Sequence, residues 1–216
     1  MAGELPTLIV AMAIVSLIPF LTVTTTCFTK IVVILLILRN ALGIQQTPPN
    51  LVLYTLSVIV TLFVMAPTFR ETYAQVSTSP VPFKTVEELE TTVQRSSVPI
   101  KAFLTRHVRS DSSAFFLDAT RRIWPEPSGL SADKEDLVIL VPAFLLSELT
   151  RAFETGFLLY IPFLLIDFVV SVVLVAIGMQ MLSPNVISTP FKLLLFVAVD
   201  GWSRLVHGLI LSYAPG

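Results

Sequence analysis

The chain has 216 residues, of which 54% are hydrophobic and only 13% are charged, and its formal net charge at pH 7 is −1. Soluble domains carry about 25% charged residues, so this composition excludes an ordinary soluble protein and indicates an integral membrane protein. The near-neutral charge offers no basic field to nucleic acid, and His107 and His207 lack the spacing of metal ligands. We therefore expect no nucleic acid partner, no metal and no cofactor.

The first hydrophobic part of the chain, residues 1–70, contains two expected helical segments. It starts with MAGELP, without Lys or Arg ahead of a long apolar stretch, so we expect no cleaved signal peptide. Residues 7–38 are longer than the about 20 residues of one membrane crossing, and Pro19 is expected to kink them. After a polar turn ending in two prolines, residues 51–69 have the length of one crossing.

A polar insert, residues 71–136, follows the first part and holds most of the charged residues of the chain. Within it, residues 85–94 and 101–123 have the spaced apolar positions of two short amphipathic helices. We expect this insert to be exposed to water.

The second hydrophobic part, residues 137–216, is expected to form a helical hairpin. Residues 137–182 are mostly apolar, and a straight helix of this length would measure roughly 70 Å, more than twice the thickness of the hydrocarbon core. After a short break, a last helix is expected over about 189–213, which places the hairpin tip at residues 179–185. The predicted fold class is therefore all-α: membrane-associated hairpins built from four long hydrophobic segments, with a partly helical insert between the second and the third.

The topology follows from the number of crossings and from two cations. Four crossings place both termini and the insert on one side of the membrane. Lys30 and Arg39 flank the first short loop, and positive charge favours the cytoplasmic side for such loops. The insert is then expected to be periplasmic.

Five ionisable residues of the second part suggest charge pairs. Glu148, Arg151 and Glu154 are spaced so that neighbours can pair along a helix, either as an inter-subunit charge network in a bundle or as a solvated helix start. Asp200 and Arg204 are four residues apart, which is typical of an intrahelical ion pair.

Asp167 and Lys192 lie in runs that are otherwise fit for hydrocarbon. An unpaired charge there would cost several kcal/mol, which favours hydrogen bonding between Asp167 and a neighbouring subunit over a proton relay. Counted along a straight hairpin, Lys192 lies about 12 Å from the tip and Asp167 roughly 25 Å from it, so the two are not expected to touch within one chain. Glu148 of a neighbouring subunit is the predicted partner of Lys192.

The tip contains Met179, Gln180 and Met181. Methionine is most often a flexible core filler, so this trio alone indicates little about function. The sequence has no phosphate loop of the GxxxxGK type, no GxSxG and no Cys/His pair at usable spacing, so we expect no enzymatic activity.

Three segments, KIVVILLILRNALGIQQTPPN, AFLLSELTRAFETGFLLYIPFLLIDFVV and GMQMLSPNVISTPFKLLLFVAVDGW, resemble the signature segments of the SctR/FliP family. These are export-apparatus proteins of bacterial type III secretion and flagellar export, and the expected lack of a signal peptide resembles the virulence-type, SctR-like branch. The resemblance implies an inner-membrane assembly raised toward the periplasm, in which the chain multimerises with itself and with sibling S, T and U-type subunits. It further implies a conduit for unfolded secreted proteins and contact with membrane lipid, without catalysis.

In the resembled family the tip is a run of consecutive methionines that looks like a flexible gasket closing the conduit. Here Met179 and Met181 match that run, and Gln180 departs from it. The rival interpretation is a small-solute or ion transporter with Asp167 and Lys192 in a coupling site. Many transporters have internal repeats, and this sequence shows none. A scaffold that only nucleates assembly is a third interpretation.

Overall fold

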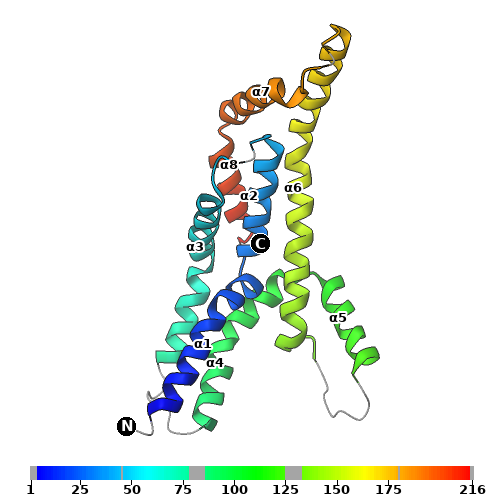
Figure 1. The fold of residues 1–216 in the computed structure, drawn as a ribbon. Coiled ribbons are helices and arrows are strands. Elements are labelled where there is room, and N and C mark those ends of the chain that lie inside the picture. The colour runs from blue at the N-terminus through cyan, green and yellow to red at the C-terminus, as the bar shows by residue number, and fades with distance from the viewer. Residues whose placement is uncertain (1–3, 45, 78–85, 125–132, 180, 215–216) are drawn as a thin grey trace. The chain divides into compact units, whose positions relative to one another are not determined.

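The computed structural model describes residues 4–44, 46–77, 86–124, 133–179 and 181–214 (Figure 1). These described residues form helices and turns and contain no strand, so the predicted all-α class is confirmed. The helices are α1 (Glu4–Thr25), α2 (Phe28–Ala41), α3 (Asn50–Ser77), α4 (Val86–His107), α5 (Ser110–Ile123), α6 (Leu137–Ala176), α7 (Pro184–Ala198) and α8 (Gly201–Leu211).

The helices supply two to four candidate membrane spans among the described residues. By length and composition, α3 and α6 can each cross a membrane. Two bent helix pairs, Ser16–Thr25 with α2 and α7 with α8, qualify if each pair counts as one span. The expected four hydrophobic segments therefore correspond to two long helices and two interrupted ones.

The first hydrophobic segment is interrupted at Thr26 and Cys27, whereas the sequence predicted a kink at Pro19, and α1 continues through that proline. Threonine hydroxyls near this end bond to backbone carbonyls: Thr24 Oγ1 donates to the carbonyl of Phe20, 2.9 Å away. Such side-chain bonds compete with the helical ladder, which explains why the helix ends here rather than at the proline.

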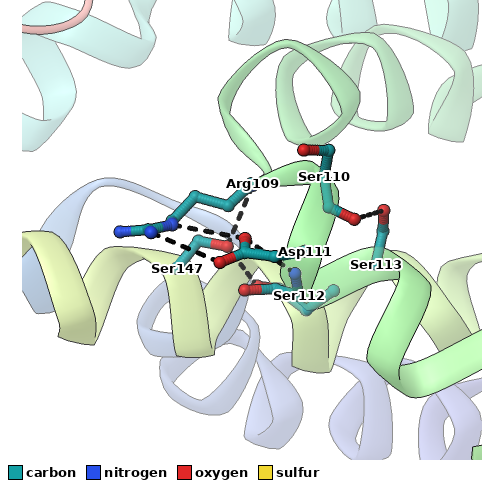
Figure 2. Close-up of polar contacts among 7 residues, drawn as sticks. Arg109, Ser110, Asp111, Ser112, Ser113 and Ser147 are labelled. Atoms are coloured by element: carbon teal, nitrogen blue, oxygen red, sulfur yellow. Dashed lines mark hydrogen bonds and ion pairs between the residues drawn. The ribbon is translucent and has the colours of Figure 1, made fainter.

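The insert contains two helices, as predicted, but their boundary differs. The sequence placed it between residues 94 and 101, whereas α4 runs through Pro99 to His107 and α5 begins at Ser110. The boundary is a polar junction at Arg109, whose backbone N–H donates to Ser147 Oγ on α6 over 3.0 Å (Figure 2).

The same junction orders the first turn of α5. The Asp111 carboxylate accepts hydrogen bonds from the Arg109 guanidinium at 3.3 Å and from the Ser112 N–H at 2.9 Å (Figure 2). The adjacent Arg109 and this backbone bond lower the pKa of Asp111. An ionised Asp in the first turn also complements the helix dipole, so the junction fixes where α5 starts.

The last hydrophobic segment is two helices, where the sequence predicted one continuous helix over 189–213. Pro184 starts α7 at a first-turn position that suits its fixed φ. The chain then bends by 62° between α7 and α8, and Asp200 at the bend has a left-handed backbone with φ of 53°. A Cβ on the following Gly201 would lie only 2.2 Å from a Phe196 ring atom, so this corner requires glycine.

The chain folds into two compact units. The first unit comprises Met1–Thr29 and Met65–Glu148, and the second comprises Lys30–Val64 and Leu149–Gly216. In the first unit, Phe103 of α4 packs edge to face on the buried Phe144 of α6, with ring centroids 5.7 Å apart.

The second unit has its core where α2, α6 and α7 meet. The cluster consists of Leu38, Ala41, Leu42, Phe163 and Phe196, with Ile44, Tyr160 and Leu205 packed against it. This cluster supports the polar site described next.

Candidate functional site

A buried ion pair joins the two arms of the hairpin formed by α6 and α7. Lys192 of α7 is only 2% exposed, and its Nζ lies 2.6 Å from Asp167 Oδ2 of α6. The same ammonium donates a hydrogen bond to the carbonyl of Ala41, the last residue of α2, over 3.0 Å. Lys192 therefore ties together three segments that are far apart in the sequence.

Ser188 completes the coordination of the carboxylate. It is fully buried, and its Oγ donates to Asp167 Oδ1 over 2.6 Å. Because Ser188 and Lys192 are four residues apart on α7, they lie on one face of the helix, and each binds a different oxygen of Asp167. Such a pair offsets its desolvation only when both partners are well hydrogen-bonded, as they are here.

The third partner of Lys192 is the C-terminal end of a helix. The last carbonyls of a helix lack intrahelical donors and carry the negative end of its dipole, so an ammonium there is favourable. Gly43, in the left-handed region with φ of 76°, ends α2, and its N–H bonds to the carbonyl of Asn40. A Cβ on Gly43 would lie 2.8 Å from Thr189 Oγ1, so glycine lets α7 approach.

This pairing corrects the prediction that Asp167 is out of reach of Lys192 in the same chain and that Glu148 of a neighbour is its partner. The prediction counted helical residues as far as Pro184. In the structure α6 ends at Ala176, and the described residues between it and α7, 177–179 and 181–183, are not helical. Asp167 is thus about 14 Å from the end of its helix and Lys192 about 12 Å from the start of its own, so they are level.

A small cavity of about 280 Å³ opens beside the ion pair. Asn40, Gly43, Ile44, Tyr160, Asp167, Asn185 and Lys192 line it. The Asp167 side chain is 26% exposed, so water can reach the acid while Lys192 stays enclosed. Among the described residues, no group of His, Cys, Asp and Glu side chains could hold a metal ion.

The hairpin tip has a capped backbone and exposed side chains. Gly178, with φ of 76°, ends the turn after α6, and the Met179 N–H donates to the carbonyl of Leu174 over 2.9 Å. Met179 is 43% exposed and Met181 is fully exposed. Gln180, the third residue of the predicted gasket, lies outside the described residues.

The remaining residues of the predicted charge network are distributed over both units. Glu148 is buried and belongs to the first unit, whereas the half-buried Arg151 and the exposed Glu154 belong to the second. A charge network that includes these three residues stays a prediction.

The predicted ion pair of Asp200 with Arg204 is not formed by these two described residues. The Asp200 carboxylate instead accepts a hydrogen bond from Ser203 Oγ over 2.9 Å. The reason is that Asp200 caps α8 in a left-handed conformation, so its side chain does not have the helical orientation that the prediction assumed. Arg204 thus remains without an acidic partner among the described residues.

Sequence reasoning missed Ser188, the Ala41 carbonyl and Gly43. The spacing of Ser188 and Lys192 is a signal that was available, because two polar residues four apart in an apolar helix share a face. The Ala41 carbonyl has no sequence signal, since any residue carries one.

Comparison with known proteins agrees with the three resembling segments. The chain is 45% identical to Yop proteins translocation protein R of Yersinia pestis over 206 residues, 95% of each chain. It is 46% identical to Harpin secretion protein HrcR of Erwinia amylovora, over 92% of this chain and 91% of the relative. It is 44% identical to Flagellar biosynthetic protein FliP of Caulobacter vibrioides, over 95% of this chain and 75% of the relative.

The match to a protein family also covers almost all of the chain. The FliP family matches residues 11–209, which include both arms of the hairpin, its tip and the ion pair. With this match and relatives of such identity along nearly the whole sequence, the chain belongs to the FliP family.

Proposed function

We propose that the protein is a core inner-membrane component of the type III secretion export apparatus. It multimerises with itself and with sibling subunits into a gated conduit through which unfolded secreted proteins pass. The single observation that supports the gate is a hairpin whose two arms are joined by a buried ion pair and whose tip exposes two methionines. The names of the relatives, translocation and secretion proteins among them, support the same role.

The hairpin suits assembly because its outer surface is apolar. Exposed side chains of α6 and the tip include Phe168, Val172, Val175 and Ile177. Contiguous exposed apolar surface of this kind marks contact with lipid or with other subunits. Packing hairpins side by side around an axis would cover this surface and bring the tips together.

The tip chemistry suits a seal that opens. Met179 and Met181 have unbranched, polarizable side chains, which pack against each other and adapt to irregular neighbours. A ring of such side chains holds back water and ions and yields when a polypeptide passes. The proposal gives the chain no catalytic step and no cofactor.

The transporter alternative receives less support. A coupling site needs a carboxylate that exchanges partners, whereas both oxygens of Asp167 are bound by Ser188 and Lys192. This arrangement favours a structural role for the ion pair, which is to hold the two arms of the hairpin together.

The gate is tested by replacing Met179 and Met181 together with Ala. We expect the assembled complex to form as before and to conduct ions or small solutes, because Ala leaves a gap where the thioethers closed it. Met12→Ala, an exposed methionine of α1, is the control and should stay tight. An assembled double variant that is as impermeable as the parent would rule out the gasket.

The periplasmic position of the insert is a separate proposal. The proposal was based on two cations beside the loop that follows α2. Lys30 is buried and donates to Ser212 Oγ, so Arg39 is the cation near that loop. In a Cys27→Ser background, we expect Ala114→Cys to react with a membrane-impermeant thiol reagent in intact cells with a permeable outer membrane. Gln46→Cys, in the loop after α2, should react only after lysis, and the reverse pattern would invert the topology.

A further inference from the structure

A second cavity in the second unit, of about 640 Å³, is partly open and is lined by residues of α2, α6, α7 and α8. Its size falls within the about 300–1,000 Å³ of typical ligand pockets. Most of its wall is aliphatic or aromatic: Leu38, Leu159, Pro162, Phe163, Leu195, Phe196, Val199, Leu205 and Leu209. The described wall contains no acidic residue, and its charged members are Lys30 and Arg204.

Lys30 is the inner cation. It is 5% exposed, its Nζ donates to Ser212 Oγ over 2.8 Å, and it lies 4.3 Å from the ring centroid of Tyr213. These contacts hold the ammonium at the end of the cavity next to the last turn of α8.

Arg204 is the outer cation. It lies on the first turn of α8 and is exposed, and none of the described acids pairs with it. Arg204 and Ser212 are eight positions apart, so their Cα atoms lie about 12 Å apart along the helix. Both line the cavity, which therefore extends along α8 with apolar side chains between two cationic ends.

Gly208 opens the wall of α8 between these levels. A Cβ built on it meets no heavy atom within 4 Å, so none of its described neighbours requires a glycine for packing. Glycine inside a helix is unfavourable relative to Ala, and here its effect is to leave space in the cavity.

We propose that this cavity binds an anionic phospholipid, with an acyl chain between the apolar walls and the headgroup phosphate on Arg204. We choose this occupant because its charge is complementary to the cavity. The described wall has two cations and no acid, and anionic lipid headgroups pair with basic pockets between membrane helices. A zwitterionic lipid also has a phosphate, but the cation of its own headgroup offsets that charge, so it would neutralise the guanidinium less. The inference is independent of the proposed gate.

Trp202 provides the probe, because its ring packs edge to face on Phe196 of the cavity wall at 5.3 Å. In a Trp124→Phe background it is the remaining tryptophan of the chain. The full chain is reconstituted in phosphatidylcholine vesicles that contain lipid with brominated acyl chains, which quench nearby tryptophan. The quenching of Trp202 fluorescence by brominated phosphatidylglycerol is compared with that by brominated phosphatidylcholine. We expect phosphatidylglycerol to bind beside Trp202 about fivefold more strongly than phosphatidylcholine, which is the effect that one basic residue has on the binding of an anionic lipid.

Two pairs of variants locate the lipid. Gly208→Leu fills the cavity and should remove the preference, whereas His207→Leu, an exposed neighbour outside the wall, should keep it. Arg204→Gln should make the two lipids equal quenchers, and Arg204→Lys should retain most of the preference. Equal quenching in the parent, or an unchanged preference in Gly208→Leu, would overturn the proposal.

An experiment on the assembled complex distinguishes a lipid in the cavity from a neighbouring subunit that fills it. The complex co-expressed with its siblings should retain phosphatidylglycerol through purification, and its Gly208→Leu variant should lose it while still assembling. Loss of assembly with no lipid retained by the parent would assign the cavity to subunit packing and refute the lipid site.

Discussion

Replacing Lys192 by Met is expected to lower the free energy of unfolding of the second unit by about 3 kcal/mol, at the low end of the cost of breaking a buried ion pair. The substitution keeps the length and apolar stem of the side chain but removes the ammonium. Asp167 then loses its counter-charge, and the carbonyl of Ala41 loses its donor. The low end applies because Asp167 is partly exposed and can recover some hydration.

Urea unfolding of the purified chain in detergent, followed by Trp202 fluorescence in a Trp124→Phe background, measures this loss. Arg204→Met removes a cation from the same unit that pairs with no described acid, and its effect should stay within about 0.5 kcal/mol. Adding Asp167→Asn to Lys192→Met should recover part of that loss, because the carboxylate is then no longer left without a counter-charge. Equal midpoints for Lys192→Met and Arg204→Met would show that the pair does not hold the hairpin.

The sequence was sufficient for the fold class and for the hairpin because these depend on long patterns. Apolar runs beyond the length of one crossing, separated by polar and proline-rich breaks, predict helices whatever their neighbours are. The two insert helices were predicted from a different pattern, the spaced apolar positions of amphipathic helices, and their boundary at Arg109 was missed. That boundary depends on a bond to Ser147, which lies 38 residues away.

The ion pair could not be predicted because it depends on how the hairpin turns. A few non-helical residues, at 177–179 and 181–183 among those described, decide whether Asp167 and Lys192 are level or more than 10 Å apart along the hairpin. The bend at Asp200 had no clear local signal either. A left-handed Asp followed by Gly201 is recognisable only once Phe196 is seen to fill the space beside it.

Replacing Phe144 by Ala should have the largest effect on the first unit, a loss of about 3–5 kcal/mol in its free energy of unfolding. Phe144 is fully buried on α6, and its ring packs edge to face on Phe103 of α4. Alanine removes this aromatic contact and leaves a cavity that two helices can close only in part.

Cys27 reports on the first unit, because it is the single cysteine of the chain and has no exposed surface. We expect Phe144→Ala to expose this thiol to a maleimide dye at a urea concentration at which the parent remains protected. Phe115→Ala is the matched control: it removes the same ring from an exposed position on α5, so Cys27 should stay as protected as in the parent. If both variants protect Cys27 equally, the contact between Phe103 and Phe144 does not stabilise the first unit, and its stability must come from other contacts.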